Sequence, residues 1–178
     1  IFICERNTSI SKFPRMNFGN MPNDGGGLIL SEEEKKDLLN EAPQAIKFIK
    51  ILLGSAEYIK GEKRYCLWIE NEQLEQAVQI PFIRTRIAIT KKHRISSKDA
   101  GTNELAKRSH QFRDRNLPKE SQLIIPRVSS EKRYYVPCGY LGNDNIVSDS
   151  AMVIYDGEPF LFGIINSRMH MVWVCTSV

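Results

Sequence analysis

Tyr65-Cys66-Leu67-Trp68-Ile69 is the run of sequence that says most about the fold, because apolar and aromatic residues follow one another there without a charged break. Such a run is typical of a strand that is buried on both faces. Glu57–Ile59 is a second strand candidate on the other side of the turn Lys60-Gly61-Glu62. Together they predict two paired strands in the first half of the chain.

Two helices are expected before this run. Ser31-Glu32-Glu33-Glu34 matches a capping box, in which the Ser hydroxyl accepts from the backbone N–H of Glu34, whose carboxylate reaches back. This pattern predicts a helix that runs to about Asn40. Pro43 suits the first turn of a second helix, which would carry apolar side chains inward as far as Gly54.

A third helix is expected to start at Pro81. Its apolar residues recur at helical spacing, and its other side carries a row of Lys and Arg as far as Lys98. A shorter helix should follow from about Thr102 to Lys107. The N-terminal part is therefore expected to be helical, with a long basic helix.

The pattern changes after Pro118 to short strand candidates separated by Gly, Asn and Asp turns. The strand candidates are Leu123–Ile125, Tyr134–Val136, Ile146–Val147 and Ala151–Ile154. From Pro159 to Trp173 the apolar residues return to helical spacing. The prediction is an α+β fold, in which the helical part is followed by a mostly antiparallel, short-stranded sheet and a C-terminal helix.

The length of 178 residues favours one domain, 1–178, with possible sub-parts 1–116 (helices and a hairpin) and 117–178 (rich in strands). The chain does not begin with Met, which suggests a piece of a larger protein. No apolar run approaches the roughly 18 residues of a membrane span, so no membrane partner is expected.

The charge is unevenly distributed. The net charge is only +4, yet residues 84–115 hold ten basic and three acidic side chains. A block of this kind is a plausible footprint for a polyanion such as DNA, because each Lys or Arg near a phosphate releases condensed counterions. A solvated helix face would show the same composition, and both interpretations stay open on composition alone.

No catalytic or metal site can be assembled from the sequence. His93, His110 and His170 match no metal-ligand spacing. Asp24-Gly25-Gly26-Gly27 lacks the Lys-Ser/Thr of a phosphate loop and is interpreted as a turn. The four cysteines form no close pair, and Cys4, Cys66 and Cys175 lie in apolar strings, so we expect buried thiols and a reducing, cytoplasmic compartment.

Five blocks in order resemble a known family. They are Phe18-Gly19-Asn20-Met21-Pro22-Asn23-Asp24-Gly25-Gly26, then Gly54-Ser55-x-Glu57-Tyr58-Ile59-x-Gly61-x-x-Arg64-Tyr65-Cys66-Leu67-Trp68-Ile69, Arg94-x-x-Ser97-x-x-x-x-Thr102-x-x-Leu105-Ala106, Pro126-Arg127-Val128-Ser129-Ser130-Glu131-x-Arg133-x-Tyr135-x-Pro137-x-Gly139-Tyr140 and Phe162-Gly163-Ile164-x-x-Ser167-x-Met169-His170-Met171-x-Trp173. They resemble the target recognition domain of MmeI-like enzymes. These are type II restriction-modification proteins that join endonuclease, adenine methyltransferase and DNA recognition in one polypeptide.

The resemblance implies a sequence-specific module that binds double-stranded DNA and positions a covalently linked adenine-N6 DNA methyltransferase. The chain itself lacks the Gly-rich S-adenosylmethionine loop and the Asn-Pro-Pro-Tyr/Phe motif of the family. We therefore expect no enzymatic activity and no cofactor in this chain, with S-adenosylmethionine bound by the parent enzyme. The resemblance also allows endonuclease activity in the parent. The alternative is a docking or scaffold domain of the same enzyme with little DNA contact of its own.

Two sets of residues would contact DNA under this interpretation. The set expected to contact phosphate is Arg84, Lys91, Lys92, Arg94 and Lys98. The set expected to contact bases or phosphate is Arg127, Ser129, Ser130, Lys132 and Arg133, with Arg168 and His170 as further candidates. The alternatives are an internal ion pair of Arg127 and Arg133 with Glu131 or Asp149, and a packed, hydrogen-bonded His170.

Overall fold

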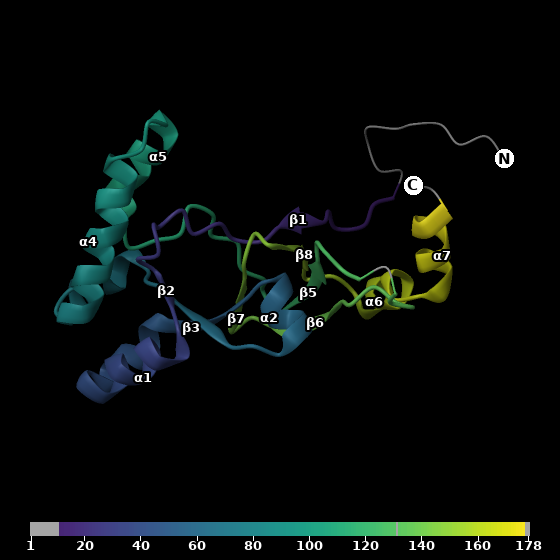
Figure 1. Cartoon of the computed structure of the whole chain (residues 1–178), viewed down its shortest axis with the longest axis horizontal. Helices are drawn as coiled ribbons and strands as arrows, with labels where there is room; N and C mark the ends of the chain where they lie inside the picture. Colours follow the sequence, from purple (N-terminus) through teal and green to yellow (C-terminus); the bar gives the residue numbers. More distant parts are fainter. Residues whose placement is uncertain (1–10, 131, 177–178) are drawn as a thin grey trace.

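The computed structural model describes residues 11–130 and 132–176 (Figure 1). The α-helices are α1 (Glu32–Glu41), α2 (Ser55–Lys60), α3 (Leu74–Ala77), α4 (Pro81–Ile95), α5 (Ala100–Glu104), α6 (Pro159–Ile165) and α7 (Arg168–Thr176). The strands are β1 (Asn17–Phe18), β2 (Ile29–Leu30), β3 (Ile49–Leu53), β4 (Arg64–Leu67), β5 (Ser121–Pro126), β6 (Gly139–Gly142), β7 (Asn145–Val147) and β8 (Ala151–Tyr155). Short 3-10 helices are η1 (Pro43–Phe48), η2 (Asn71–Gln73) and η3 (Leu105–Arg108).

Two four-stranded sheets form the centre of the described part of the chain. The first has the order β1-β8-β5-β6 and is antiparallel throughout. The second has the order β2-β4-β3-β7 and is antiparallel except for the parallel pair β3–β7. The α+β class is confirmed. The strands are not confined to one C-terminal sheet, because each sheet takes strands from both 1–116 and 117–178.

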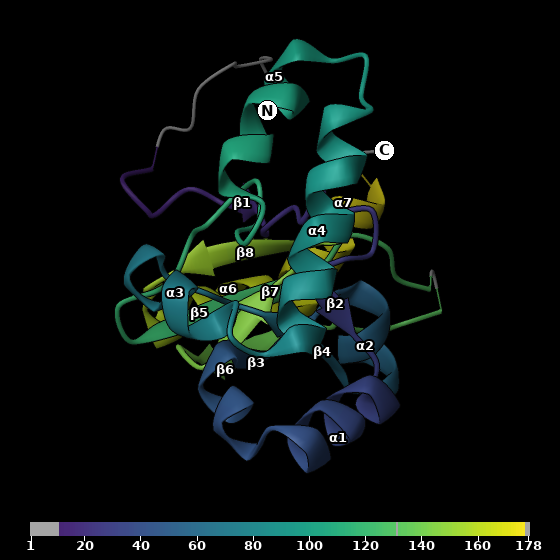
Figure 2. The same ribbon diagram turned by 90° about the vertical axis from the view of Figure 1, so that its left-hand side faces the viewer.

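Apart from α2, which lies against β3 and β5, and the short α3, the helices labelled in Figure 1 lie at the two ends of the sheets. In Figure 1, α1, α4 and α5 lie at one end of the long axis, and α6 and α7 lie at the other. Figure 2 views the first end and shows α4 and α5 extending beyond the sheets. The main core lies near this end and buries Leu38 of α1, Leu67 of β4 and Ile83 of α4. A smaller core joins Leu123 and Ile154 of the first sheet to α6.

Several local predictions are confirmed by side-chain contacts. At the N-terminus of α1, Ser31 Oγ accepts from Glu34 N (3.1 Å) and Ser31 N donates to the Glu34 carboxylate (2.9 Å), which completes the capping box. The turn after Asn23 is held by the buried Asp24, whose carboxylate accepts from Gly26 N and Leu28 N. β4 is the buried strand expected over residues 65–69.

The predicted hairpin is wrong in its first strand, because residues 57–59 belong to helix α2. The Glu57 carboxylate accepts from Gly54 N (3.0 Å) and from Arg64 Nη1 (2.6 Å), which caps one end of α2. At the other end Gly61 has φ +71°, a left-handed conformation that ends a helix at little cost for glycine. The strand that takes the place of the predicted first strand beside β4 is β3, which precedes α2.

Three other expected elements differ from the structure. The helix from Pro43 to Gly54 is replaced by η1 and β3, because β3 pairs on both edges, with β4 and with β7. Residues 134–136 form no strand. The single helix from Pro159 to Trp173 is divided into α6 and α7 at residues 166–167. Cys66 is buried as expected, Cys175 is exposed, and Cys4 lies outside the described residues.

Candidate nucleic-acid interface

The exposed cations of α4 form the first candidate surface. Arg84, Lys91 and Lys92 are exposed on this helix, and Lys98 is exposed three residues after its last residue. The cations of α4 do not share one exposed face as expected, because Arg86 and Arg94 point inward. The Arg86 guanidinium pairs with Glu34 (2.7 Å) and donates to the Gly27 carbonyl (2.9 Å).

Arg94 is fully buried, and the prediction that it contacts phosphate is wrong for this structure. Its five N–H donors all point at backbone carbonyls of the protein. They donate at 2.7–3.1 Å to the carbonyls of Pro22, Asn23, Leu105, Arg108 and Gln111. Burial is the main cause that lowers the pKa of Arg94, followed by Arg108. Arg94 therefore joins residues 22–23 to the segment 105–111.

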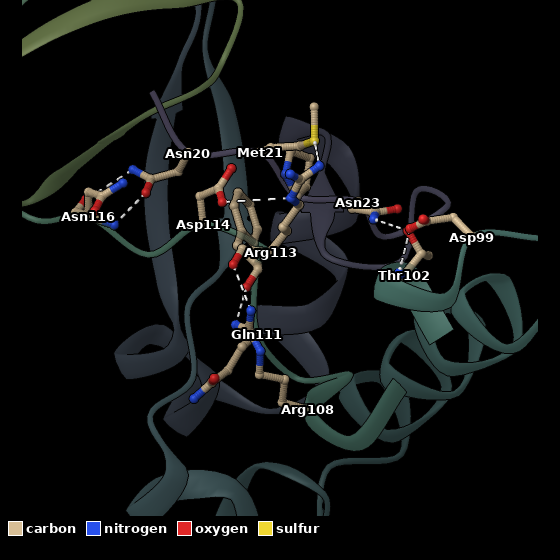
Figure 3. Close-up of polar contacts among 12 residues, drawn as sticks. Asn20, Met21, Asn23, Asp99, Thr102, Arg108, Gln111, Arg113, Asp114 and Asn116 are labelled. Carbon is tan, nitrogen blue, oxygen red and sulfur yellow. Dashed lines mark hydrogen bonds and ion pairs between the residues drawn. The ribbon is translucent and has the colours of Figure 1, made fainter. Parts of the chain in front are cut away.

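Further polar contacts join these same segments (Figure 3). Asn20 and Asn116 exchange two hydrogen bonds, from Asn20 Nδ2 to the Asn116 carbonyl (3.0 Å) and from Asn116 N to Asn20 Oδ1 (2.5 Å). Asn23 Nδ2 donates to Thr102 Oγ1 (3.1 Å). We call the contacts of residues 20–24 with residues 94–116 the junction. It sets where α4 and α5 stand relative to the sheets.

An open groove of about 620 Å³ lies beside the junction, lined in part by Asp99, Arg108, Arg113 and Asp114. The Arg108 guanidinium donates to the carbonyls of Phe112 (2.8 Å) and Arg113 (2.7 Å). Two carboxylates balance two guanidinium groups here. This groove is therefore a poorer anion surface than the exposed side of α4.

His110 contacts Asn71 of η2, outside the junction, and makes the stability of the domain depend on pH. Its Nε2 lies 3.0 Å from Asn71 Oδ1, and burial, followed by Arg115, Arg108 and Arg94, lowers its pKa. The unfolded chain, with an ordinary His pKa of about 6.5, then binds a proton more readily than the folded one. The contribution of His110 to stability is present above that pH and is lost as the pH falls through the lower folded-state pKa.

We expect His110→Gln to lose less unfolding free energy than the wild-type protein when the pH is lowered from about 7 to 5. The Gln amide can still donate to Asn71 but does not titrate. The measurement is urea unfolding of both proteins across this range. His93→Gln is the matched control, because it removes a histidine that is exposed on α4. Parallel curves for wild type and His110→Gln would contradict the assignment.

The second candidate surface is a groove at the opposite end of the molecule. It has a volume of about 460 Å³ and lies between the loop at 132–134 and helix α7. The loop contributes Lys132, Arg133 and Tyr134, and α7 contributes Arg168, Met171, Val172 and Cys175. The Arg168 guanidinium lies over the Tyr134 ring, 5.3 Å from its centroid. The structure thus brings three predicted cations together and adds an aromatic residue, Tyr134, that is 71% exposed.

Arg127, Ser129 and Ser130 are exposed on the loop after β5. Arg127 makes no ion pair with the Asp149 carboxylate; its Nη1 donates to the Asp149 backbone carbonyl (3.3 Å). Its guanidinium also lies over the ring of Phe18, 4.9 Å from the centroid. Among the described residues Arg133 has no ion pair, and its other suggested partner, Glu131, lies outside the description.

His170 fits the packed alternative. Its Nδ1 lies 2.7 Å from the Ile165 carbonyl and its backbone N donates to Ser167 Oγ (3.1 Å), so these contacts fix the start of α7. A contact of its remaining ring nitrogen with DNA stays a prediction.

Sequence reasoning missed two aromatic side chains, Tyr134 and Phe18. For Tyr134 a signal was present, because Tyr134-Tyr135 directly follows Lys132-Arg133, and interleaved cations and aromatics are typical of nucleic-acid binding. For Phe18 there was none, since exposure of a residue next to a buried sheet cannot be read from composition.

Over residues 11–130 and 132–176, no group of three or more His, Cys, Asp or Glu side chains is placed to hold a metal ion. Within the same ranges, none of the helices has the length and apolar character needed to span a bilayer.

Comparisons with known proteins agree with this geometry. The family model for the target recognition domain of MmeI matches residues 1–177. DNA methyltransferase A of Bacillus subtilis (strain 168) is 45% identical over 174 residues, which cover 98% of this chain and 20% of that protein. The structure of the type IIL restriction-modification enzyme MmeI in complex with DNA matches with a TM-score of 0.88 and 31% identity, over 97% of this chain and 23% of that one. The chain thus spans about a fifth of the length of these relatives, and it belongs to the family of MmeI target recognition domains.

Proposed function

We propose that this domain recognises a specific sequence in double-stranded DNA and positions a linked adenine-N6 methyltransferase, which takes its methyl group from S-adenosylmethionine bound elsewhere in the parent protein. The observation that carries the proposal is the groove at 132–134 and α7, where three cations and an exposed tyrosine share one surface. The relative of known structure was determined with DNA, and the curated relative is named a DNA methyltransferase, which supports the same role.

DNA recognition and methyl transfer require separate parts of the protein. Methylation of adenine requires the base to leave the duplex stack and enter a pocket of the methyltransferase. A separate element must hold the duplex and read the remaining base edges while this happens. Cations on a surface position the phosphates, and Arg or Ser donors next to them can reach base edges. We infer that the catalytic steps belong to the parent protein, which would act in the cytoplasm.

The two candidate surfaces lie at opposite ends of the long axis, so one short patch of DNA backbone cannot contact both (Figure 1). Either the duplex runs along the length of the domain, or only one surface contacts it. Apolar side chains exposed on α6 and α7 favour a second role, docking to the rest of the polypeptide. Among them are Phe160 (52% exposed), Ile164 (44%) and Met169 (81%).

The dependence of DNA binding on salt tests the proposal. In the full-length protein, removing a cation that neutralises one phosphate should reduce the slope of log Kobs against log salt by about 0.9. We expect twice this reduction, about 1.8, for the double substitution Lys132→Ala with Arg133→Ala, and for Lys91→Ala with Lys92→Ala if the duplex reaches α4. The measurement is the binding constant on a fixed duplex at several salt concentrations.

The matched control is Lys60→Ala with Lys63→Ala. Both lysines are exposed, and their substitution removes the same charge as each test pair. They lie at the end of α2 and just after it, outside both candidate surfaces. An unchanged slope for both test pairs would exclude phosphate contacts and leave the docking role. A reduction by the control pair as well would show only a general effect of net charge.

A further inference from the structure

Phe18 is an exposed aromatic side chain on the short edge strand β1. Its side chain is 57% exposed, although β1 pairs directly with β8 through the register Phe18↔Met152. A single exposed phenylalanine is ordinary on a protein surface, and what distinguishes Phe18 is the cation that lies over its ring. Its only ring or cation contact in the described structure is with Arg127, from the loop after β5.

The pair of Phe18 and Arg127 is held in place from both sides. Arg127 Nη1 donates to the Asp149 carbonyl (3.3 Å), and Arg127 N donates to Ser55 Oγ (3.0 Å). On the other side, Gly19 N donates to the Ala151 carbonyl (3.1 Å) directly after Phe18. The guanidinium therefore covers part of the ring in a fixed position, while more than half of the side chain faces solvent.

The surroundings are apolar and cationic. Val128, next to Arg127, is 75% exposed, and Met16, two residues before Phe18, is 44% exposed. Lys12 and Arg15 are exposed on the segment that leads into β1, and residues 11–18 contain no acidic side chain. An apolar tip with cations beside it matches the chemistry of a side chain that enters a base step, with phosphates on either side.

We propose that Phe18, oriented by Arg127, stacks on a nucleobase at an unstacked step of the bound duplex. The inference rests on the proposed function, and it deepens that function by naming the group that compensates for the opened stack. A phenyl ring offers the π-face and the apolar area that a base loses when its neighbour leaves, and stacking of this kind tolerates any base. Phe18 is a positioning residue here, because it holds the distorted duplex and takes no part in methyl transfer.

The probe is a duplex with a single abasic site, compared with a fully paired duplex of the same sequence. The abasic duplex has already lost the stacking that must otherwise be broken, so the full-length wild-type protein should bind it more tightly. Phe18→Ala should weaken binding to both duplexes about tenfold, in the range found for the loss of one base–aromatic stack, because the ring stacks at an opened step in both complexes. Phe18→Trp should keep both affinities, because indole also stacks.

Phe13→Ala is the matched control. Phe13 is 48% exposed and lies near β1 in the chain, but its ring contacts Phe160 (5.4 Å between centroids) and not Arg127. It should leave the affinities for both duplexes unchanged. Thermal unfolding of each variant checks that the fold is intact, and the exposure of Phe18 makes a large change in stability unexpected.

The outcomes separate this inference from the proposed function. If the wild-type protein binds neither duplex, the proposed function fails, and this inference fails with it. If the wild-type protein binds DNA and Phe18→Ala lowers neither affinity, the stacking role is overturned while DNA binding stands. A loss that Phe18→Trp shares with Phe18→Ala would also overturn it, because the ability of the ring to stack would then not matter.

Discussion

Replacing Arg94 by methionine should lower the free energy of unfolding of the domain by about 3–5 kcal/mol, the cost of removing one member of a buried charged contact. Methionine fills much of the same volume but donates no hydrogen bond. Five backbone carbonyls from two segments would then lose their shared donor in a buried site. Arg94→Lys should recover only part of the loss, because an ammonium offers three donors instead of five.

Urea unfolding of the domain measures this effect. Lys91→Ala is the control on the same helix, and an exposed substitution of this kind should stay within about 0.5 kcal/mol of wild type. If Arg94→Met kept its stability and instead weakened DNA binding with a smaller salt slope, the phosphate contact expected from the sequence would be reinstated.

Gly19→Ala should cost about 3 kcal/mol of unfolding free energy, which is large for the addition of one methyl group. A Cβ at this position would lie 2.6 Å from the Ser148 carbonyl carbon and 2.7 Å from the Val147 carbonyl oxygen, closer than real Cβ atoms approach. Both are backbone atoms. They are held by the pairing of β7 with β3 and by the bridge between Asn20 and Ser148, so neither can move aside cheaply.

Gly163→Ala is the control, and it should act in the opposite direction. A Cβ there meets no atom within 4 Å, and the residue lies inside helix α6. Alanine should therefore stabilise the domain by up to about 1 kcal/mol through helix propensity. Both variants are compared with wild type by the same urea unfolding measurement. An equal, small effect of the two substitutions would show that the backbone at 147–148 moves aside easily.

The sequence predicted those elements whose signals are local. The capping box at Ser31, the proline at the start of α4 and the apolar run of β4 each act through neighbours in the chain. Residues 49–53 carried no such signal, since a short apolar run fits a buried strand as well as a helix. Only the pairing with β4, beyond α2, and with β7, far along the chain, decides for a strand.

The site shows the same division between local and distant causes. Lys132, Arg133 and Arg168 were identified as cations, but only the fold brings the loop at 132–134 against α7. Arg94 lies on the same face of α4 as the buried Ile83 and Thr90, so the helical period indicates an inward position that its charge seemed to forbid. What makes this position possible is the convergence of carbonyls from residues 22–23 and 105–111, which no helical period contains.

The pairing of β1 with β8 has a consequence for the synthesis of the protein. Phe18 leaves the ribosome long before Met152, its partner in the sheet, and at about 5–20 residues per second the interval between them is roughly 7–27 s. The second sheet also waits for a late strand, because β3 lies beside β7. During translation, neither sheet can be completed from the nascent N-terminal half alone. The apolar run of β4 therefore emerges before its sheet is complete. Until β7 is synthesised, a nascent chain in this state depends on rapid completion of the sheet, or on chaperones, to escape aggregation.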